Sequence, residues 1–388
     1  MKARLGDVCT VVSGSTPKST VPEYWDGDIK WITPAELSND TYIINDSERH
    51  ITALGVAKTG LKSFPAGTVI LSSRAPIGKT AIAGCEMFCN QGFKNLICSE
   101  KIDSKYLYYF LSGKTDYLNS LGRGATFKEI SKAIVENIEI PLPEVEEQKR
   151  IAARFERLLR LIQLQKAELE ELDKLVKSRF IELFGDPVRN SMGLPTEPMT
   201  TVCAIIDGDR GKNYPKQDEF SDTGYCLFLN AKNVTATGFS FENRMFITKE
   251  KDNALHNGKL ERGDVVLTTR GTLGNLAFYD DSVPFENVRI NSGMVILRMK
   301  KSVMTEVFFM EQFKLQLQSI KGKIASGSAQ PQLPISTMSK IRILLAPMAL
   351  QEQFAAFVEQ TDKSKLAVQK GLQELEILKK SLMQQYFG

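Results

Sequence analysis

The sequence predicts a mixed α/β (α+β) protein with two similar globular domains, separated by two long helices that pair as an antiparallel coiled coil with pseudo-two-fold symmetry. Three observations predict this architecture. The chain repeats itself, each copy holds strand-like segments rich in Val, Ile and Leu, and each copy closes with a long heptad-patterned segment. At 388 residues the chain also exceeds the size of one compact core, so more than one domain is expected.

The repeat is clearest in the second half of each copy. Residues 122–185 align with residues 325–388 without a gap, and both segments end in Phe-Gly. Upstream, AGTVILSSRAPIG (66–78) matches RGDVVLTTRGTLG (262–274). Because such self-similarity marks a repeated structural unit, the shared segments are expected to form a common scaffold. The chain then divides into a globular, a helical, a second globular and a second helical part: 1–142, 143–185, 186–345 and 346–388.

Two segments fail to align, residues 15–64 and residues 209–260, and the two copies are expected to differ in their tasks there. Punctuation by Gly and Pro predicts the other elements of the first copy. These are, in chain order, a short helix over 7–14, strands over 68–73, 79–84 and 92–98, a helix over 105–121 and a strand over 134–140. Pro141 and Pro143 then end that strand and start the long helix.

Apolar residues recur along both long segments at alternating steps of four and three, which is typical of a seam that faces a partner helix. Gln165 and Arg179 interrupt the first seam, and Thr361, Lys365 and Lys379 weaken the second. The predicted seam residues are Ile151, Phe155, Leu158, Ile162, Leu169, Leu172, Val176, Leu183, Phe354, Val358, Val368, Leu372, Leu375 and Leu382. A single helix lying on its own globule is the alternative, but the duplicate copy favours antiparallel pairing of the two.

Composition excludes several classes of protein. The chain has no run of about 18 apolar residues, so no membrane span is expected. Its first residues lack the apolar core of a secretion signal, so a cytoplasmic location is expected. The net charge of +4 and the pI near 8.5 are compatible with nucleic acid but decide little.

A metal site is a weak hypothesis for this chain. The spacing of Cys85, Cys89 and Cys98 suggests zinc, but a structural zinc site needs four ligands and the second copy has no equivalent cluster. Buried reduced thiols are the better interpretation. The chain has only two histidines, in unrelated contexts, so neither a catalytic dyad nor a histidine-rich metal site is expected.

The segment SRAPIGKT (73–80) nearly matches a phosphate-binding P-loop, which raises the hypothesis of a nucleotide-dependent enzyme that uses Lys79. A P-loop must open a helix, whereas the following AIAGCEMF is typical of a strand and a turn. The second copy has Asn275 in place of the lysine. The tetrapeptides typical of amino-methyltransferases are also absent from the sequence, so no catalytic residue is expected.

The same turn offers a better hypothesis, because Arg74 aligns with Arg270 and each follows an apolar strand. An arginine on a rigid turn suits a guanine edge or a phosphate. Matching Gly-rich basic loops (121–129 and 320–333) and a basic segment confined to the second copy (208–216) add further candidates. The candidate nucleic-acid contacts are Arg74, Lys79, Arg123, Lys128, Arg210, Lys212, Lys216, Arg270, Asn275, Lys321, Lys323, Ser328, Gln330 and Gln332. Surface arginines and plain connecting loops remain the alternative.

Several motifs together resemble one known family. IPLPEVEEQKRIAARFERLLRLI (140–162), followed by LFGDPV (183–188), is similar to the central conserved region of specificity (S, or HsdS) subunits of type I restriction-modification systems. LAPMALQEQFAAFVEQTDK (345–363) resembles the companion C-terminal region, although Ala346 replaces the first proline of its junction. RLGDVCTVVSGSTP (4–17) resembles the start of a target recognition domain, so residues 1–142 and 186–345 would be the two recognition domains.

The resemblance implies a DNA-recognition subunit without catalysis. Each recognition domain would read one half of a bipartite, asymmetric site in double-stranded DNA, and the helices would set the spacer. Two methyltransferase subunits would dock on the scaffold and methylate adenine with S-adenosylmethionine, and nuclease subunits that use ATP and Mg²⁺ could join them. The resemblance therefore assigns every cofactor to a partner. A non-catalytic protein whose coiled coil tethers two modules that do not bind DNA is the alternative.

Overall fold

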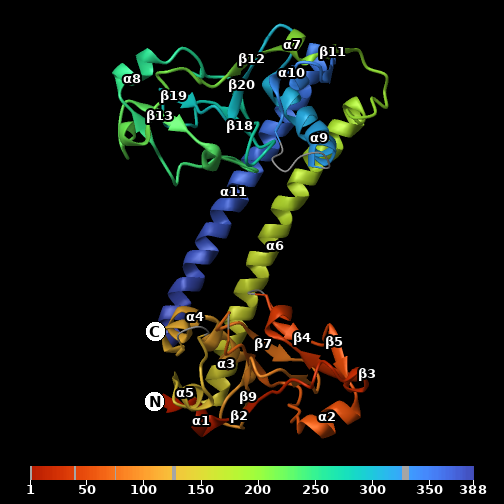
Figure 1. Cartoon of the computed structure of the whole chain (residues 1–388), viewed down its shortest axis with the longest axis vertical. Coiled ribbons are helices and arrows are strands. Elements are labelled where there is room, and N and C mark those ends of the chain that lie inside the picture. Colours follow the sequence, from red (N-terminus) through yellow and green to blue (C-terminus); the bar gives the residue numbers. More distant parts are fainter. Residues whose placement is uncertain (1, 39–40, 75, 125–127, 326–331) are drawn as a thin grey trace. The chain divides into compact units, whose positions relative to one another are not determined.

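The computed structural model describes residues 2–38, 41–74, 76–124, 128–325 and 332–388 (Figure 1). It contains two compact units, and each unit combines one globular part with one end of each long helix. Unit 1 comprises residues 1–167 and 369–388, and unit 2 comprises residues 168–368.

Unit 1 is built mainly from strands that alternate with short helices. Its elements are β1 (Lys2–Arg4), α1 (Leu5–Val8), β2 (Cys9–Ser13), η1 (Pro22–Tyr24), β3 (Trp25–Ile32), η2 (Pro34–Glu36), β4 (Ile43–Ile44), β5 (Arg49–Ile51), α2 (Ala53–Thr59), β6 (Val69–Leu71), β7 (Thr80–Ala83), β8 (Phe88–Cys89), β9 (Lys94–Cys98), α3 (Ser104–Ser112), α4 (Thr115–Leu121), α5 (Lys132–Glu136), β10 (Glu139–Pro141) and the start of α6 (Val145–Phe184).

Unit 2 largely repeats this order. After the end of α6 come β11 (Thr196–Pro198), α7 (Met199–Val202), β12 (Cys203–Asp207), η3 (Gln217–Glu219), β13 (Cys226–Leu229), η4 (Ala231–Asn233), β14 (Val234–Thr235), β15 (Gly238–Phe239), β16 (Phe246–Ile247), α8 (Lys249–Ala254), β17 (Asp264–Thr268), β18 (Leu276–Tyr279), β19 (Val288–Ile290), β20 (Met294–Met299), α9 (Glu306–Ala325), α10 (Ile335–Met338), β21 (Arg342–Leu344) and the start of α11 (Met348–Phe387). Unit 2 thus has the pair β14 and β15 in the region of β4, and one helix, α9, in place of α3 and α4.

The main sheets of the two units share four antiparallel strands, since the order β2-β9-β6-β7 in unit 1 corresponds to β12-β20-β17-β18 in unit 2. Unit 1 adds a fifth strand, β4, parallel to β7, whereas β14 and β15 of unit 2 form a separate antiparallel pair. A second, three-stranded sheet holds one antiparallel and one parallel pair in each unit, β5-β3-β8 and β16-β13-β19. The predicted repeat is therefore confirmed, and each segment that does not align in sequence still supplies two of the three strands of this second sheet.

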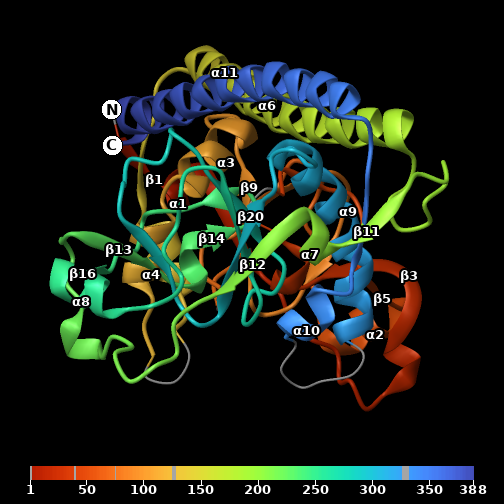
Figure 2. The same cartoon turned by 90° about the horizontal axis from the view of Figure 1, so that it is seen from above.

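The two long helices pair in antiparallel fashion, as predicted, and within each unit the segments of α6 and α11 lie side by side (Figures 1 and 2). In unit 1 the start of α6 meets the end of α11, where Phe155 stacks on Phe387 with ring centroids 5.8 Å apart. In unit 2 the end of α6 meets the start of α11, where the Phe180 and Phe354 centroids are 5.5 Å apart. Opposite ends of the helices therefore contact each other in each unit.

None of the predicted seam residues is exposed. Ile151, Phe155, Leu158, Ile162, Val176, Phe354 and Val358 are buried, and Leu169, Leu172, Leu183, Val368, Leu372, Leu375 and Leu382 are half-buried. Two of the polar interruptions, Thr361 and Lys365, have partners for their side chains. Lys365 forms an ion pair with Asp173 across the helices at 2.7 Å, and the buried Thr361 hydroxyl donates to the Phe357 carbonyl. Gln165 packs against Gly371, where a Cβ would come within 2.8 Å of the glutamine amide.

Two short elements differ from the sequence prediction. The helix predicted over 7–14 is wrong, because α1 ends at Val8 and residues 9–13 form strand β2, in which Cys9 and Val11 are buried and Thr10 is exposed. That alternation is the period of a strand. The strand predicted over 134–140 is also wrong. The Ser131 hydroxyl accepts a hydrogen bond from the Ile134 amide and caps α5, so only Glu139–Pro141 is left as strand.

The helix predicted over 105–121 is two helices, α3 and α4, separated at Gly113 and Lys114. A Cβ on Gly113 would lie 2.9 Å from the Met383 sulfur of α11, so glycine permits this close approach. The corresponding helix of unit 2, α9, continues without a break from Glu306 to Ala325.

Candidate functional site

The arginine-bearing turns predicted from the repeat have the same construction in both units. In unit 1 the Ser72 hydroxyl donates to the Pro76 carbonyl and accepts from the Lys79 amide, at 2.7 and 2.8 Å. In unit 2 the Thr268 hydroxyl makes the equivalent bonds to the Thr272 carbonyl and the Asn275 amide. The turns close at glycines with φ of 94° and 81°, Gly78 and Gly274, a left-handed conformation that other residues rarely adopt. Each arginine is therefore followed by a turn whose backbone is constrained by these hydrogen bonds and by a left-handed glycine.

The end of the following Gly-rich loop joins each turn. Arg74 forms an isolated antiparallel bridge with Glu129, and Arg270 forms the matching bridge with Gln332. The next amide of each loop donates back to the turn, from Ile130 to the Ser73 carbonyl at 2.9 Å, with an equivalent bond in unit 2 at 3.1 Å. Turn and loop were predicted separately as candidate sites, and the structure brings them together.

We name two sets of side chains for these places. The unit 1 turn cluster is Arg74, Lys94 and Glu129, and the unit 2 turn cluster is Arg270, Val295 and Gln332. Lys94 of β9 and Val295 of β20 are equivalent because each pairs with the last residue of the neighbouring strand, Ser13 of β2 and Asp207 of β12, respectively. Glu129 and Gln332 are equivalent because each bridges the turn arginine. The two clusters therefore correspond residue by residue.

The unit 1 turn cluster is an ion-paired triad. The Glu129 carboxylate forms an ion pair with the Arg74 guanidinium at 2.9 Å and accepts a hydrogen bond from the Lys94 ammonium at 3.1 Å. The Lys94 side chain is only 8% exposed, whereas that of Arg74 is 44% exposed. Burial opposes ionisation of Glu129, but the hydrogen bonds from Arg74 and Lys94 outweigh it and lower the pKa of the carboxyl. The triad keeps one net positive charge at the surface.

The unit 2 turn cluster carries one charged side chain, and a pocket lies beside it. Arg270 is exposed, and among the residues that the structure describes it makes no ion pair. Beside it lies a pocket of about 240 Å³ lined in part by Asp207, Arg210 and Gln332. Asp207 and Arg210 form an ion pair at 3.1 Å and neutralise each other. The net charge of the cluster is again one positive charge, carried by the arginine alone.

Other candidate residues are already engaged by the fold. The Lys79 ammonium donates to the carbonyls of Leu37 and Pro34, and the Asn275 amide donates to the Val234 carbonyl at 2.9 Å. Residue 80 begins strand β7, so no helix opens after this turn as a P-loop requires. The geometry therefore gives Lys79 a structural place and does not favour the nucleotide hypothesis.

The remaining candidates have varied surroundings. Those with exposed side chains are Arg123, Lys128, Lys212 and Lys216. Lys321 is half-buried and lies against the turn, where a Cβ on Gly274 would meet its side chain. Lys323 lies near the end of α9, and Ser328 and Gln330 lie outside the described residues. Sequence reasoning missed Lys94 and Glu129, because only the strand register and the bridge place them beside Arg74.

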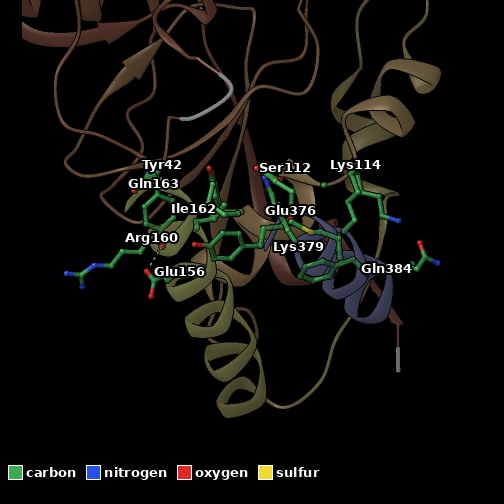
Figure 3. A pocket seen from close by; sticks show the side chains of 18 of the residues that line it. Tyr42, Ser112, Lys114, Glu156, Arg160, Ile162, Gln163, Glu376, Lys379 and Gln384 are labelled. Atoms are coloured by element: carbon green, nitrogen blue, oxygen red, sulfur yellow. Dashed lines mark hydrogen bonds between the residues drawn. The ribbon is translucent and has the colours of Figure 1, made fainter. Parts of the chain in front are cut away.

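A separate pocket of about 930 Å³ lies in unit 1 beside the break between α3 and α4 (Figure 3). Tyr42 donates to Glu156 at 2.7 Å, and Lys105 pairs with the same carboxylate at 2.7 Å. Burial raises the pKa of the Tyr42 phenol, and its hydrogen bond to Glu156 adds to the effect. The lining is polar, with Lys114 and Lys379 among its cations. Histidine and cysteine are absent from the described residues of its lining.

The cysteines proposed for zinc have separate partners. The Cys89 sulfur accepts from the Asn95 amide, Cys98 faces Cys9 across β2 and β9, and Cys85 lies 3.5 Å from the Lys30 ammonium. Burial raises the pKa of Cys89 to about 12. Within the described ranges no three His, Cys, Asp or Glu side chains gather as a metal site would need, and no helix there is long and apolar enough to cross a membrane.

Comparison with known proteins connects this geometry to one family. The model of the type I restriction modification DNA specificity domain matches residues 1–174 and 200–377. The chain is 30% identical to the type I restriction enzyme MjaIX specificity subunit of Methanocaldococcus jannaschii, over 98% of this chain and 90% of that protein. It is 25% identical to the MjaVIII specificity subunit of the same organism, with the same coverage.

Two solved structures share the fold over the whole chain. One is the S subunit of a type I restriction-modification system from M. genitalium, with a TM-score of 0.58 and 17% identity over 96% of that protein. The other belongs to a study of complex assembly and conformational transition of the type I R-M system, with a TM-score of 0.63 and 18% identity over 97% of that chain. At these identities the likeness concerns the fold alone.

Proposed function

Because this chain belongs to the family of type I restriction-modification DNA specificity subunits, we propose that its two turn clusters contact the two halves of one DNA site. DNA recognition is the function of this family, and the comparisons favour it over the tethering protein without DNA binding. The observation that carries the proposal is the repetition of Arg74 and Arg270 on equivalent rigid turns of equivalent sheets. The segments that differ between the units flank these turns and would supply the different half-sites.

Arginine is the side chain best suited to this task. Its guanidinium carries five donors in a fixed plane and can bond a guanine edge through two of them, or a phosphate through its charge. Arg123 and Lys128 in unit 1, and Lys212 and Lys321 in unit 2, would supply phosphate contacts around the arginines. Such contacts position the protein on the duplex, whereas base contacts specify the sequence.

Partner docking is the second part of the proposal. Several large apolar side chains of α6 and α11 lie off the seam and are exposed, which favours a protein partner on these faces. They are Leu161 (50% exposed), Leu164 (55%), Leu175 (48%), Leu366 (68%), Ile377 (66%) and Leu378 (47%). The repeated scaffold would dock two methyltransferase subunits, and nuclease subunits could join them. S-adenosylmethionine, ATP and Mg²⁺ would be bound by those partners in the cytoplasm, and this chain would perform no chemistry itself.

Alanine substitution of each arginine tests the proposal. We expect Arg74→Ala to relax discrimination at one half-site and Arg270→Ala at the other, each by about 5- to 150-fold, the range of one bidentate base contact. The measurement is competition binding by the chain in complex with its methyltransferase partner, at stated salt, against duplexes altered in one half-site. Lys101→Ala is the matched control, since this exposed lysine follows the far end of β9. Loss at both half-sites from one substitution, or at neither, contradicts the proposal.

A further inference from the structure

We propose that Glu129 is a positioning residue that holds Arg74 in its DNA-reading orientation before DNA binds, and that no described residue of unit 2 holds Arg270 in this way. The inference rests on the proposed function, because it takes both arginines as DNA contacts. It concerns how the two halves of one site are read differently by the same scaffold.

Glu129 is itself fixed on both sides. Its amide donates to the Arg123 carbonyl at 2.9 Å, and its carbonyl accepts from the Arg123 amide at 3.0 Å. The next amide, of Ile130, is bound to the Ser73 carbonyl beside Arg74. The carboxylate therefore starts from a backbone that is anchored to the arginine's own turn, unlike a surface glutamate on a free loop.

Lys94 holds the Glu129 carboxylate beside Arg74. The lysine side chain is almost fully buried, and its ammonium donates to Glu129 at 3.1 Å and to the Ser73 hydroxyl at 3.3 Å. A buried ammonium without an anionic partner is costly, so Glu129 cannot turn toward solvent without destabilising unit 1. Because one oxygen of Glu129 is held by Lys94, the other remains directed at the Nη2 atom of Arg74.

The contact with Glu129 leaves Arg74 able to bind DNA. Only Nη2 of Arg74 bonds Glu129, and the 44% exposed side chain keeps its other donors for a base edge. An arginine that is already ordered loses less side-chain freedom on binding, and this raises affinity for the matching base. Arg74 is therefore a pre-positioned reader.

Unit 2 shows that the fold does not need the ion pair. Val295 replaces Lys94 and Gln332 replaces Glu129, so both charges are absent together while the arginine is kept. The four shared antiparallel strands, the turn and the bridge to the loop are nevertheless the same. The pair in unit 1 is thus an addition that serves Arg74 and not a requirement of the sheet.

The test converts the unit 1 turn cluster into the unit 2 type. The variant Lys94→Val with Glu129→Gln removes one positive and one negative charge, so the net charge and the salt dependence of DNA binding should stay unchanged. We expect discrimination at the unit 1 half-site to fall by about 2- to 12-fold, the effect of ordering one long side chain. The other half-site and the thermal midpoint should be unaffected, which a merely structural role of the pair would not produce.

The reciprocal variant Gln332→Glu places a carboxylate beside Arg270 and should raise discrimination at the unit 2 half-site. Both variants are measured in the complex with the methyltransferase partner, by competition binding against half-site-altered duplexes. The inference is overturned if the double variant discriminates as the parent does while Arg74→Ala still relaxes its half-site. If Arg74→Ala also has no effect, the proposed DNA contact fails, and the positioning role fails with it.

Discussion

The two segments that do not align, residues 15–64 and 209–260, supply equivalent strands to the three-stranded sheets of the two units but different interiors. In unit 1, residues 15–64 place an apolar cluster around Trp25, Trp31 and Ile51 on the three-stranded sheet, with Arg49 stacked 3.7 Å above the Trp25 ring. In unit 2, the equivalent sheet packs next to a buried ion pair, Asp252 with Arg289. The same strand order of this three-stranded sheet is thus compatible with different interior side chains.

The turn clusters repeat the same contrast at the surface. Unit 1 surrounds its arginine with a lysine and a glutamate, and unit 2 has valine and glutamine there. Both clusters therefore keep the arginine and one net positive charge while the neighbours of the arginine vary. Under the proposed function, the two units would attract DNA alike and differ in the side chains around the arginine.

The largest expected effects come from the helix pair, where both units depend on aromatic packing. Phe155 and Phe180 are fully buried in unit 1 and unit 2, respectively. Each Phe→Ala substitution should cost about 3–5 kcal/mol of unfolding free energy, through the lost contacts and the cavity left behind. Hydrogen exchange should place the loss in the unit that carries the substitution.

Tryptophan fluorescence sharpens that comparison, because both tryptophans lie in unit 1. Urea unfolding followed by fluorescence should shift for Phe155→Ala more than for Phe180→Ala. Leu161→Ala, at a position that is 50% exposed, is the control and should stay within about 0.5 kcal/mol of the parent protein. Equal fluorescence shifts for the two phenylalanine variants would show that the units do not unfold separately.

A smaller effect is expected from Asp252→Asn, confined to unit 2. The Asp252 side chain is 1% exposed and that of Arg289 is 6% exposed, so the substitution leaves a buried guanidinium without its anion, at a cost of about 3 kcal/mol. Burial opposes ionisation of Asp252, but hydrogen bonds from Lys259 and Arg289 outweigh it and lower the pKa of the carboxyl. Unit 1 has no such pair in its apolar cluster and should not respond.

The lowered pKa fixes the sign of a pH effect. A carboxyl with a depressed pKa in the folded state adds stability that is complete above its ordinary value, near 3.9, and is lost as the pH falls through the lower folded value. The parent protein should therefore lose stability below about pH 4 more steeply than Asp252→Asn. Parallel acid unfolding curves for the two proteins would contradict this role of the pair.

Sequence reasoning captured what is periodic or duplicated. The seam of α6 and α11 follows from the heptad spacing, and the equivalence of Arg74 and Arg270 follows from the aligned turns. Short elements were less predictable, since the segment after Val8 has apolar residues that suit a helix turn or a strand equally well. The break at Gly113 depends on the approach of Met383 from the distant end of the chain.

The equivalent positions of the two turn arginines were predictable from the sequence, whereas the residues that contact Arg74 were not; the role of these arginines as DNA contacts stays a prediction. Lys94 looks like an ordinary strand residue, and only its register opposite Ser13 brings it to the turn. Glu129 ends a basic loop in which only the cations were predicted as contacts. Lys79 shows the reverse, because a promising motif lysine is held by the carbonyls of Leu37 and Pro34. Contacts between segments that are far apart in sequence decide such cases.

Exchange of one recognition domain tests the central claim most directly. Residues 1–140 are replaced by the corresponding residues of a related specificity subunit, and the adenine methylation pattern of DNA is sequenced in cells that contain the hybrid and its partners. Two units that read independently predict a new sequence in one half of the methylated site, with the other half and the spacer retained. A change in both halves at once would contradict the account.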